Sequence, residues 1–238
     1  MNNNQQIKLS PNSLNLFLEC PLCFWLEKRE GIKRPPPYPY ALNAAIDKLL
    51  KEEFDYYRRK GELHPMLIEN NIQAKLFENQ ELLNEWRSNF KGIRYYDSQL
   101  SATLFGAVDD ILEFPDRKLA PLDYKSTGSK EANIYERFQL QMDVYAYLLE
   151  KNNFSTTGKG YLAFYIVNKE DGFEGRLPFR RELKEIKTDP SRVPKLFRKA
   201  VALLESNIPP LHSSNCKFGQ WFDEVSNLQY KSNKKLKS

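Results

Sequence analysis

The sequence predicts an α/β domain in which helices flank a mixed sheet, and three observations support this fold class. Apolar and polar residues alternate with period two over residues 99–114 and 119–126, as they do in half-buried strands. A strong helical pattern follows from about residue 131 to residue 151. The apolar run 161–167 then supplies a further strand, so strands and helices alternate along this half of the chain.

The N-terminal part is expected to be a short tail followed by helices. Residues 1–9 are interpreted as a disordered tail, and Ser10 before Pro11 is a typical start of a helix. The proline-rich residues 34–40 favour an extended linker. A helix is expected from about 41 to 59, and residues 62–92 are predicted to form a mainly helical insertion.

The C-terminal part is expected to complete one domain. Residues 176–183 are interpreted as a strand and residues 190–207 as a helix. The chain has 238 residues, which suits one domain with an insertion. We therefore expect a single domain over residues 10–228, followed by a basic, frayed tail over 229–238.

Composition excludes several classes of protein. Lys and Arg number 36 against 31 Asp and Glu, and the resulting charge of +5 permits binding to nucleic acid without requiring it. No apolar stretch is long enough for a membrane span, and the first residues lack an apolar signal core, so we expect a cytoplasmic protein. Three Cys and two His leave little material for a disulfide framework or a histidine-based catalytic triad.

The candidate chemistry centres on Asp109, Asp123 and Lys125. Alternate side chains of a strand share a face, so Asp123 and Lys125 point to the same side, roughly 6–7 Å apart. If the turn at 115–118 pairs the two strands as antiparallel neighbours, Asp109 can approach Asp123. Two adjacent carboxylates repel each other, and Mg²⁺ or Mn²⁺ between them would remove that repulsion. A nearby lysine can orient an attacking water or stabilise charge on a phosphate, as phosphodiester hydrolysis requires.

The acid-x-Lys spacing has little weight by itself. It occurs four times, at Asp116–Lys118, Asp123–Lys125, Glu182–Lys184 and Glu185–Lys187. Each pair taken singly is explained as a surface ion pair, which contributes only about 0–1 kcal/mol. The functional interpretation therefore depends on the order of the surrounding motifs.

That order resembles the RecB-like branch of the PD-(D/E)xK nuclease superfamily, which includes the CRISPR adaptation nucleases. Gly106-x-x-Asp109 is followed by a turn, by Asp123-x-Lys125 and by a helix carrying Gln141-x-x-x-Tyr145. The opening segment, from Ser10-Pro11 to Phe24-Trp25, is also similar to that branch. The resemblance implies a restriction-endonuclease-like core, a central mixed sheet flanked by helices, and nucleic-acid cleavage with Mg²⁺ or Mn²⁺.

The resemblance also implies roles for individual residues. Asp109, Asp123 and the Tyr124 carbonyl would be metal ligands, and Lys125 would be the catalytic lysine. Gln141 and Tyr145, one helical turn apart, would help to bind substrate. Taken without the motif order, Tyr145 is a core aromatic and Gln141 a solvated polar side chain.

Asp47 marks a departure from the family's pattern. Many relatives carry a histidine metal ligand on the first core helix, and the matching helix here offers Asp47. An aspartate can also bind a hard cation, so Asp47 is a candidate ligand. The alternative is an exposed aspartate paired with Lys51 at i+4.

The cysteines present an incomplete metal motif. Several family members hold an iron–sulfur cluster between N-terminal and C-terminal cysteines, but only Cys20, Cys23 and Cys216 are available here. A four-thiolate cluster is therefore not expected. His212 could complete a Cys₃His zinc site. Buried thiols that no longer hold a metal are the favoured interpretation.

The expected function is a metal-dependent deoxyribonuclease, exonuclease-like, with DNA favoured over RNA as substrate. Arg58 and Arg137 are among the basic residues that could hold phosphates, and Tyr135 is among the aromatics that could stack on unpaired bases. One alternative is a catalytically impaired nucleic-acid-binding module that keeps the nuclease fold. Another is a structural protein whose acidic pair merely holds a metal.

Overall fold

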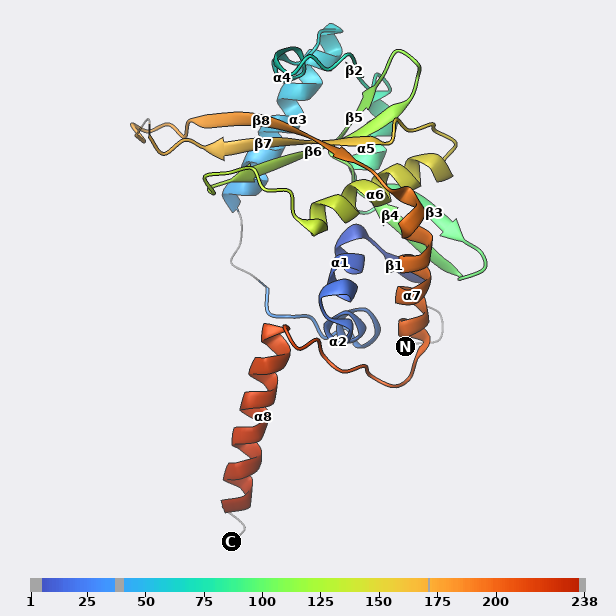
Figure 1. Cartoon of the computed structure of the whole chain (residues 1–238), viewed down its shortest axis with the longest axis vertical. Coiled ribbons are helices and arrows are strands. Elements are labelled where there is room, and N and C mark those ends of the chain that lie inside the picture. The colour runs from blue at the N-terminus through green and yellow to red at the C-terminus, as the bar shows by residue number, and fades with distance from the viewer. Residues whose placement is uncertain (1–5, 37–40, 171, 236–238) are drawn as a thin grey trace.

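The computed structural model describes residues 6–36, 41–170 and 172–235, and of 229–235 it describes the backbone alone. Two sheets with helices around them form the body, and a long C-terminal helix extends away from it (Figure 1). The proline-rich linker is described only at 34–36, where it has no regular structure, and the rest of it lies outside the described residues.

The larger sheet has five strands in the order β2-β5-β6-β7-β8. Only β6 and β7 pair in parallel, and the other neighbours are antiparallel. The parallel pair is connected through helix α6, which forms a β-α-β unit. The strands are β2 (Lys75–Leu76), β5 (Asp110–Glu113), β6 (Leu119–Thr127), β7 (Lys159–Val167) and β8 (Phe179–Lys187).

The smaller sheet has three strands in the order β1-β4-β3. Its strands are β1 (Ile7–Leu9), β3 (Ile93–Asp97) and β4 (Ala102–Gly106). Strand β1 pairs in parallel with β4, and Leu9 is completely buried. The expectation of a disordered tail is therefore wrong for residues 7–9, because pairing with a distant strand orders them. Residues 1–5 lie outside the described part of the chain.

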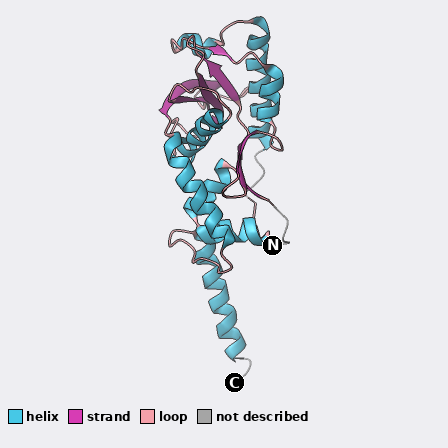
Figure 2. Cartoon of the chain, turned by 90° about the vertical axis from the view of Figure 1, so that its right-hand side faces the viewer, coloured by secondary structure: helices cyan, strands magenta, loops and turns pink. Residues whose placement is uncertain are grey.

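The two faces of the larger sheet pack into two apolar clusters. Leu122, Tyr124 and Ala163 face helices α3 (Ala41–Lys60) and α4 (Pro65–Glu69). Their sequence neighbours on the opposite face pack against α6 (Glu136–Lys151) and α7 (Val193–Glu205). This division follows from the period of two in the strands. Figure 2 shows helices on both sides of the strands.

Helix α6 lies between the two sheets (Figure 1), with contacts to β3, β4 and β6. Nearly all of its residues from Leu140 to Leu149 are buried. Helix α1 (Pro11–Glu19) packs beside it and begins where the sequence indicates, because Ser10 accepts a hydrogen bond from the Ser13 amide. Helix α2 (Pro21–Trp25) and a short π-helix, η1 (Leu26–Glu30), follow.

Several elements differ from the sequence-based expectation. Residues 62–92 are not a helical insertion, because strand β2 within them forms an edge of the larger sheet and only α4 and α5 (Gln80–Arg87) are helical. The pattern over 99–114 is divided between β4 and β5, which belong to different sheets. The helix expected over 190–207 is confirmed by α7 (Val193–Glu205), and only its first residues differ, because they form a short 3₁₀ turn, η2 (Pro190–Arg192).

Helix α8 (Lys217–Lys235) was not expected, and the tail predicted to fray from residue 229 is helical as far as Lys235. Residues 236–238 lie outside the described part. Among the described helices, none combines the length and apolar character that crossing a membrane requires.

Candidate active site

Asp109 lies in the bend where the two sheets separate. Strand β4 ends at Gly106 and β5 begins at Asp110, so Asp109 belongs to neither strand. Its Oδ2 accepts a hydrogen bond of 3.0 Å from the backbone N–H of Tyr124 on β6. This contact places the Asp109 carboxylate beside the residue that follows Asp123.

Asp123 and Lys125 share the face of β6 that packs on α6. The pairing of β5 with β6 is antiparallel and follows a turn over 115–118, as the sequence indicates. Asp123 is only 2% exposed. The Lys125 ammonium forms an ion pair with Asp123 Oδ2, although without hydrogen-bond geometry. The structure thus brings together Asp109, Asp123 and Lys125.

The Asp123 carboxyl is strongly perturbed. Its pKa is raised from the ordinary 3.8 to about 7, mainly by burial; the Lys125 ammonium opposes this rise, and the charge of Asp109 adds to it. A carboxylate in this position is stabilised by any cation that approaches it. The environment of Asp123 is therefore suited to binding a divalent cation.

Helix α6 holds Asp123 and Lys125 in place through Gln141. Its Nε2 donates to Asp123 Oδ1 at 2.9 Å and to the Tyr145 hydroxyl at 2.7 Å. Its Oε1 accepts a hydrogen bond of 3.2 Å from Lys125. The Tyr145 hydroxyl in turn donates to the Ala107 carbonyl at 2.6 Å. Gln141 and Tyr145 therefore connect β6 to the bend that carries Asp109, and their expected role in substrate binding stays a prediction.

Gly106 is required for this arrangement. A Cβ atom at this position would lie 2.7 Å from Tyr145 Cε1 and 2.9 Å from its Cδ1. The Tyr145 ring is buried, so it has little room to move away. The glycine of the Gly106-x-x-Asp109 motif thus allows the tyrosine to pack against the end of β4.

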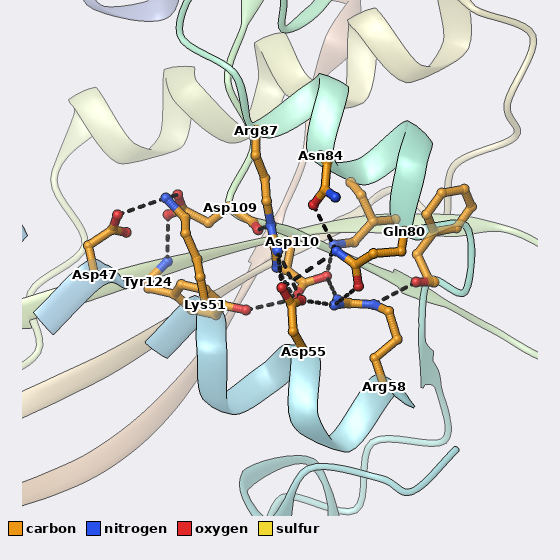
Figure 3. Close-up of polar contacts among 12 residues, drawn as sticks. Asp47, Lys51, Asp55, Arg58, Gln80, Asn84, Arg87, Asp109, Asp110 and Tyr124 are labelled. Atoms are coloured by element: carbon orange, nitrogen blue, oxygen red, sulfur yellow. Dashed lines mark hydrogen bonds and ion pairs between the residues drawn. The ribbon is translucent and has the colours of Figure 1, made fainter. Parts of the chain in front are cut away.

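Asp47 reaches the edge of the site through Lys51. The Lys51 ammonium lies 2.8 Å from Asp47 Oδ2 and 2.9 Å from Asp109 Oδ1, so it bridges the two carboxylates (Figure 3). The i+4 ion pair foreseen as the alternative is present, and the same ammonium also contacts Asp109. Ligation of a metal by Asp47 stays a prediction.

The carboxylates fit a divalent cation best as a pair. Asp109 and Asp123 flank the Tyr124 backbone, and both carboxylates already have ammonium groups as cationic partners. Asp47, Asp109 and Asp123 do not form a compact set of three ligands, because among the described residues only the three cysteines bring three ligand atoms within 4.8 Å of one another. Oxygen ligands of this kind suit Mg²⁺ or Mn²⁺.

A buried ionic network lies on the opposite face of β5 and was not foreseen. Its centre is Asp110, which is completely buried. Arg58 from α3 and Arg87 from α5 both pair with Asp110, and the Tyr124 hydroxyl donates to it at 2.7 Å (Figure 3). Arg58 is buried in this network, so the expectation that it holds phosphates is wrong.

The network also reaches the backbone of the site. Arg87 Nε donates to the Asp109 carbonyl at 2.6 Å, and its Nη1 contacts both oxygens of Asp55 at 2.8 and 2.9 Å. Arg87 therefore fixes the bend from which the Asp109 side chain projects. The adjacent acids Asp109 and Asp110 were the only signal of this network in the sequence, since two neighbouring carboxylates that point in different directions need separate partners.

Arg137 lies on the exposed side of α6 near Lys125. Its guanidinium stacks on Tyr135 at 4.7 Å and on Phe138 at 4.9 Å, measured to the ring centroids. The Lys125 ammonium lies 4.8 Å from the same Phe138 ring. Arg137 and Tyr135 are exposed, so both are accessible to a ligand that reaches Lys125.

Comparison with known proteins adds a family match. The model of the PD-(D/E)XK nuclease superfamily matches residues 36–221. A search of curated proteins found no match. Similar solved structures include SSO0001, which is 14% identical over 85% of this chain and 79% of its own, with a TM-score of 0.45. They also include an alkaline exonuclease from Laribacter hongkongensis, 10% identical over 95% of this chain and 94% of its own, with a TM-score of 0.42.

Proposed function

The chain belongs to the PD-(D/E)XK nuclease superfamily, and from this premise we propose that it is a metal-dependent deoxyribonuclease with Asp109, Asp123 and Lys125 at its active site. The observation that carries the proposal is the convergence of these three side chains from the β4–β5 bend and from β6. Gln141 binds both Asp123 and Lys125, so the set is held in one arrangement.

Asp109, Asp123 and the Tyr124 carbonyl would hold the cation, with Asp47 as a further ligand. A bound Mg²⁺ or Mn²⁺ supplies Lewis acidity, which makes a water nucleophilic and neutralises charge on the phosphate. The raised pKa of Asp123 supports this assignment, since a buried carboxylate without full compensation favours a nearby cation.

Lys125 acts on the reacting groups. Its ammonium is held between Asp123, Gln141 and the Phe138 ring, so its donors have fixed directions. From this position it orients the attacking water or donates to the phosphate oxygen on which charge develops. Removal of such a preorganised donor lowers rates by about 10²–10³-fold.

The assignment of DNA and of exonuclease-like action rests on the resemblance of the motif order to RecB-like exonucleases. Arg137 and Tyr135 are exposed beside the site and suit a phosphate and an unpaired base, respectively. Such contacts position a strand without reading its sequence.

Lys51 favours one alternative function. Its ammonium lies between Asp47 and Asp109, where a cation would otherwise interact with both carboxylates. If this ion pair excludes the metal, the chain is a nucleic-acid-binding module that keeps the nuclease fold. Its binding would weaken with salt, and no metal would produce cleavage.

The test is a cleavage assay on end-labelled single-stranded and double-stranded DNA, with RNA in parallel, in Mg²⁺, Mn²⁺ or chelator. Lys125→Ala is compared with Lys118→Ala, because Lys118 has the same spacing from its acid but forms an exposed pair at the β5–β6 turn. We expect metal-dependent cleavage that Lys125→Ala slows by about 10²–10³-fold and Lys118→Ala leaves unchanged. Cleavage by Lys125→Ala at the wild-type rate contradicts the site, and folded wild type that binds DNA without cleaving it supports the alternative.

A further inference from the structure

A second group of metal-ligating side chains lies far from the acidic site. Cys20 separates α1 from α2, Cys23 lies within α2, and Cys216 immediately precedes α8. Their Sγ atoms all lie within 4.8 Å of one another, although Cys23 and Cys216 are 193 positions apart in the sequence. Cys20 and Cys216 are buried, and all three are free thiols.

The spacing of the sulfurs agrees with a single tetrahedral ion. Zn–S bonds of about 2.3 Å in a tetrahedron keep sulfurs about 3.8 Å apart. Cys23 Sγ and Cys216 Sγ are separated by 3.6 Å. That distance is too long for a disulfide, whose sulfurs are about 2.05 Å apart.

Backbone and charged donors already surround the sulfurs. The Gly219 N–H points to Cys216 Sγ at 3.4 Å, and the Cys23 N–H donates to the sulfur of Cys20. Both contacts run from the residue three positions later, so the two segments have the same local geometry. Arg34 Nη2 lies 3.6 Å from Cys216 Sγ and offsets negative charge on thiolates.

The missing fourth thiol is replaced in space by an imidazole. Gly219 lies three positions after Cys216, just as Cys23 lies three positions after Cys20, so Gly219 occupies the place of a fourth cysteine. A Cβ on Gly219 would lie 2.4 Å from His212 Cγ and 2.6 Å from its Nδ1. The His212 ring therefore fills the volume where a cysteine at 219 would begin. The glycine both removes the fourth thiol and admits the histidine.

One of the two contacts of His212 matches that of a metal-ligating histidine, and the other must be broken for Nδ1 to bind a metal. Its Nε2 lies 2.8 Å from Asp223 Oδ2, and a carboxylate on one ring nitrogen leaves the other free to bind a metal. Nδ1 faces the Ser213 carbonyl at 2.9 Å. His212 is outside the 4.8 Å group, so its ring must turn from that carbonyl toward the sulfurs to bind.

We propose that Cys20, Cys23, Cys216 and His212 form a structural Zn²⁺ site that ties α1 and α2 to the segment leading into α8. Three thiolates and one imidazole suit tetrahedral zinc. This proposal replaces the sequence-based preference for thiols that hold no metal. The site is independent of the acidic centre on β6.

The first test is the metal content of the chain purified under reducing conditions, measured by elemental analysis. The expected result is one zinc per chain and no sulfide. After chelation, Co²⁺ is titrated into the folded protein, and the visible spectrum of a tetrahedral thiolate complex is expected to appear. Absence of zinc together with absence of the cobalt spectrum overturns the proposal, as does recovery of iron with sulfide or of a Cys23–Cys216 disulfide.

Substitutions at the fourth position test the histidine. His212→Ala should weaken zinc binding by at least roughly 100-fold, because even outer partners of a ligand change affinity by about 10–100-fold. Gly219→Cys combined with His212→Gly supplies a fourth thiol in the space that the whole side chain vacates, and tight binding should return. Glycine is needed at 212 because a Cβ at 219 would lie 2.9 Å from His212 Cβ. Asp223→Asn should weaken binding roughly 10-fold.

Two outcomes of these substitutions contradict the assignment. If His212→Ala leaves the zinc affinity unchanged, the histidine is not a ligand. If Gly219→Cys does not restore binding, a thiol at position 219 cannot take the place of the His212 imidazole. Lys125→Ala is the control and should bind zinc as the wild type does, which separates this test from that of the nuclease. Circular dichroism identifies any variant that does not fold. If a variant does not fold, the cobalt titration of the wild type decides whether the metal site exists.

Discussion

Replacing Asp123 by Asn should stabilise the metal-free protein, increasingly so as the pH rises. Burial raises the pKa of the Asp123 carboxyl to about 7. Below about pH 4 the folded and unfolded states are both protonated, so the group does not affect stability. Between about pH 4 and pH 7 the unfolded chain releases its proton first, which lowers the free energy of unfolding as the pH rises. Above about pH 7 the loss is complete, and Asn does not incur it.

The size of the effect follows from the two pKa values. The interval from 3.8 to about 7 corresponds to about 4 kcal/mol, at about 1.4 kcal/mol for each tenfold change in acidity. This is a ceiling, because the ion pair with Lys125 adjusts when the charge is removed. More than half of the loss develops between pH 5 and pH 8, so we expect the advantage of Asn to grow by about 1–2 kcal/mol over that range. In a chain of this size the corresponding gain in Tm is roughly 2–8 °C.

The assay is thermal and urea unfolding of wild type and Asp123→Asn in chelator at several pH values. Asp116→Asn is the matched control, because Asp116 is exposed and Lys118 lowers its pKa, so its substitution should not stabilise the protein as the pH rises. In excess Mg²⁺ the advantage of Asn should shrink by about 2.7 kcal/mol, since a cation at 100 times its Kd stabilises only the wild type by that amount. A difference that does not change with pH, or one that turns against Asn in chelator, would refute the reasoning.

Three further predictions concern the surroundings of the site. Asp110→Asn should lower the free energy of unfolding by about 3 kcal/mol, since the buried guanidiniums of Arg58 and Arg87 lose their carboxylate partner. Urea unfolding measures this loss, and a change under 1 kcal/mol would contradict the network. Gly106→Ala should displace the Tyr145 ring and lower cleavage by about 10²-fold while DNA binding persists, and equal kinetics in both proteins would exclude the close contact. Lys51→Met should tighten Mg²⁺ binding in calorimetry, because the ammonium that competes for Asp109 is removed, and weaker binding would give Lys51 a different role.

The core of the candidate site follows from local patterns in the sequence. The period of two in β6 puts Asp123 and Lys125 on one face, and the turn at 115–118 pairs β5 with β6. Helical spacing puts Gln141 one turn before Tyr145. These relations depend on neighbours within a few residues, so the sequence determined them.

Patterns within short segments led to wrong predictions of secondary structure at two places. The alternation over 99–114 continues through residues 107–109, where the chain leaves one sheet and enters another. Ile7–Leu9 are too short a segment to indicate a strand, and only pairing with β4 orders them. A pattern within one segment contains no information on which distant segment will supply its hydrogen-bond partners.

Tertiary structure alone decided which charges meet. Lys51 is placed against Asp109 by the packing of α3, and Arg87 reaches Asp110 through the packing of α5. The three cysteines meet because the α1–α2 junction and α2, near one end of the chain, lie beside the segment that enters α8 near the other. In each case the side chains are far apart in the sequence and meet only when apolar faces are buried. The chemistry of single strands and helices was therefore determined by the sequence, while the partners of Asp109, Asp110 and Cys216 were decided by the fold.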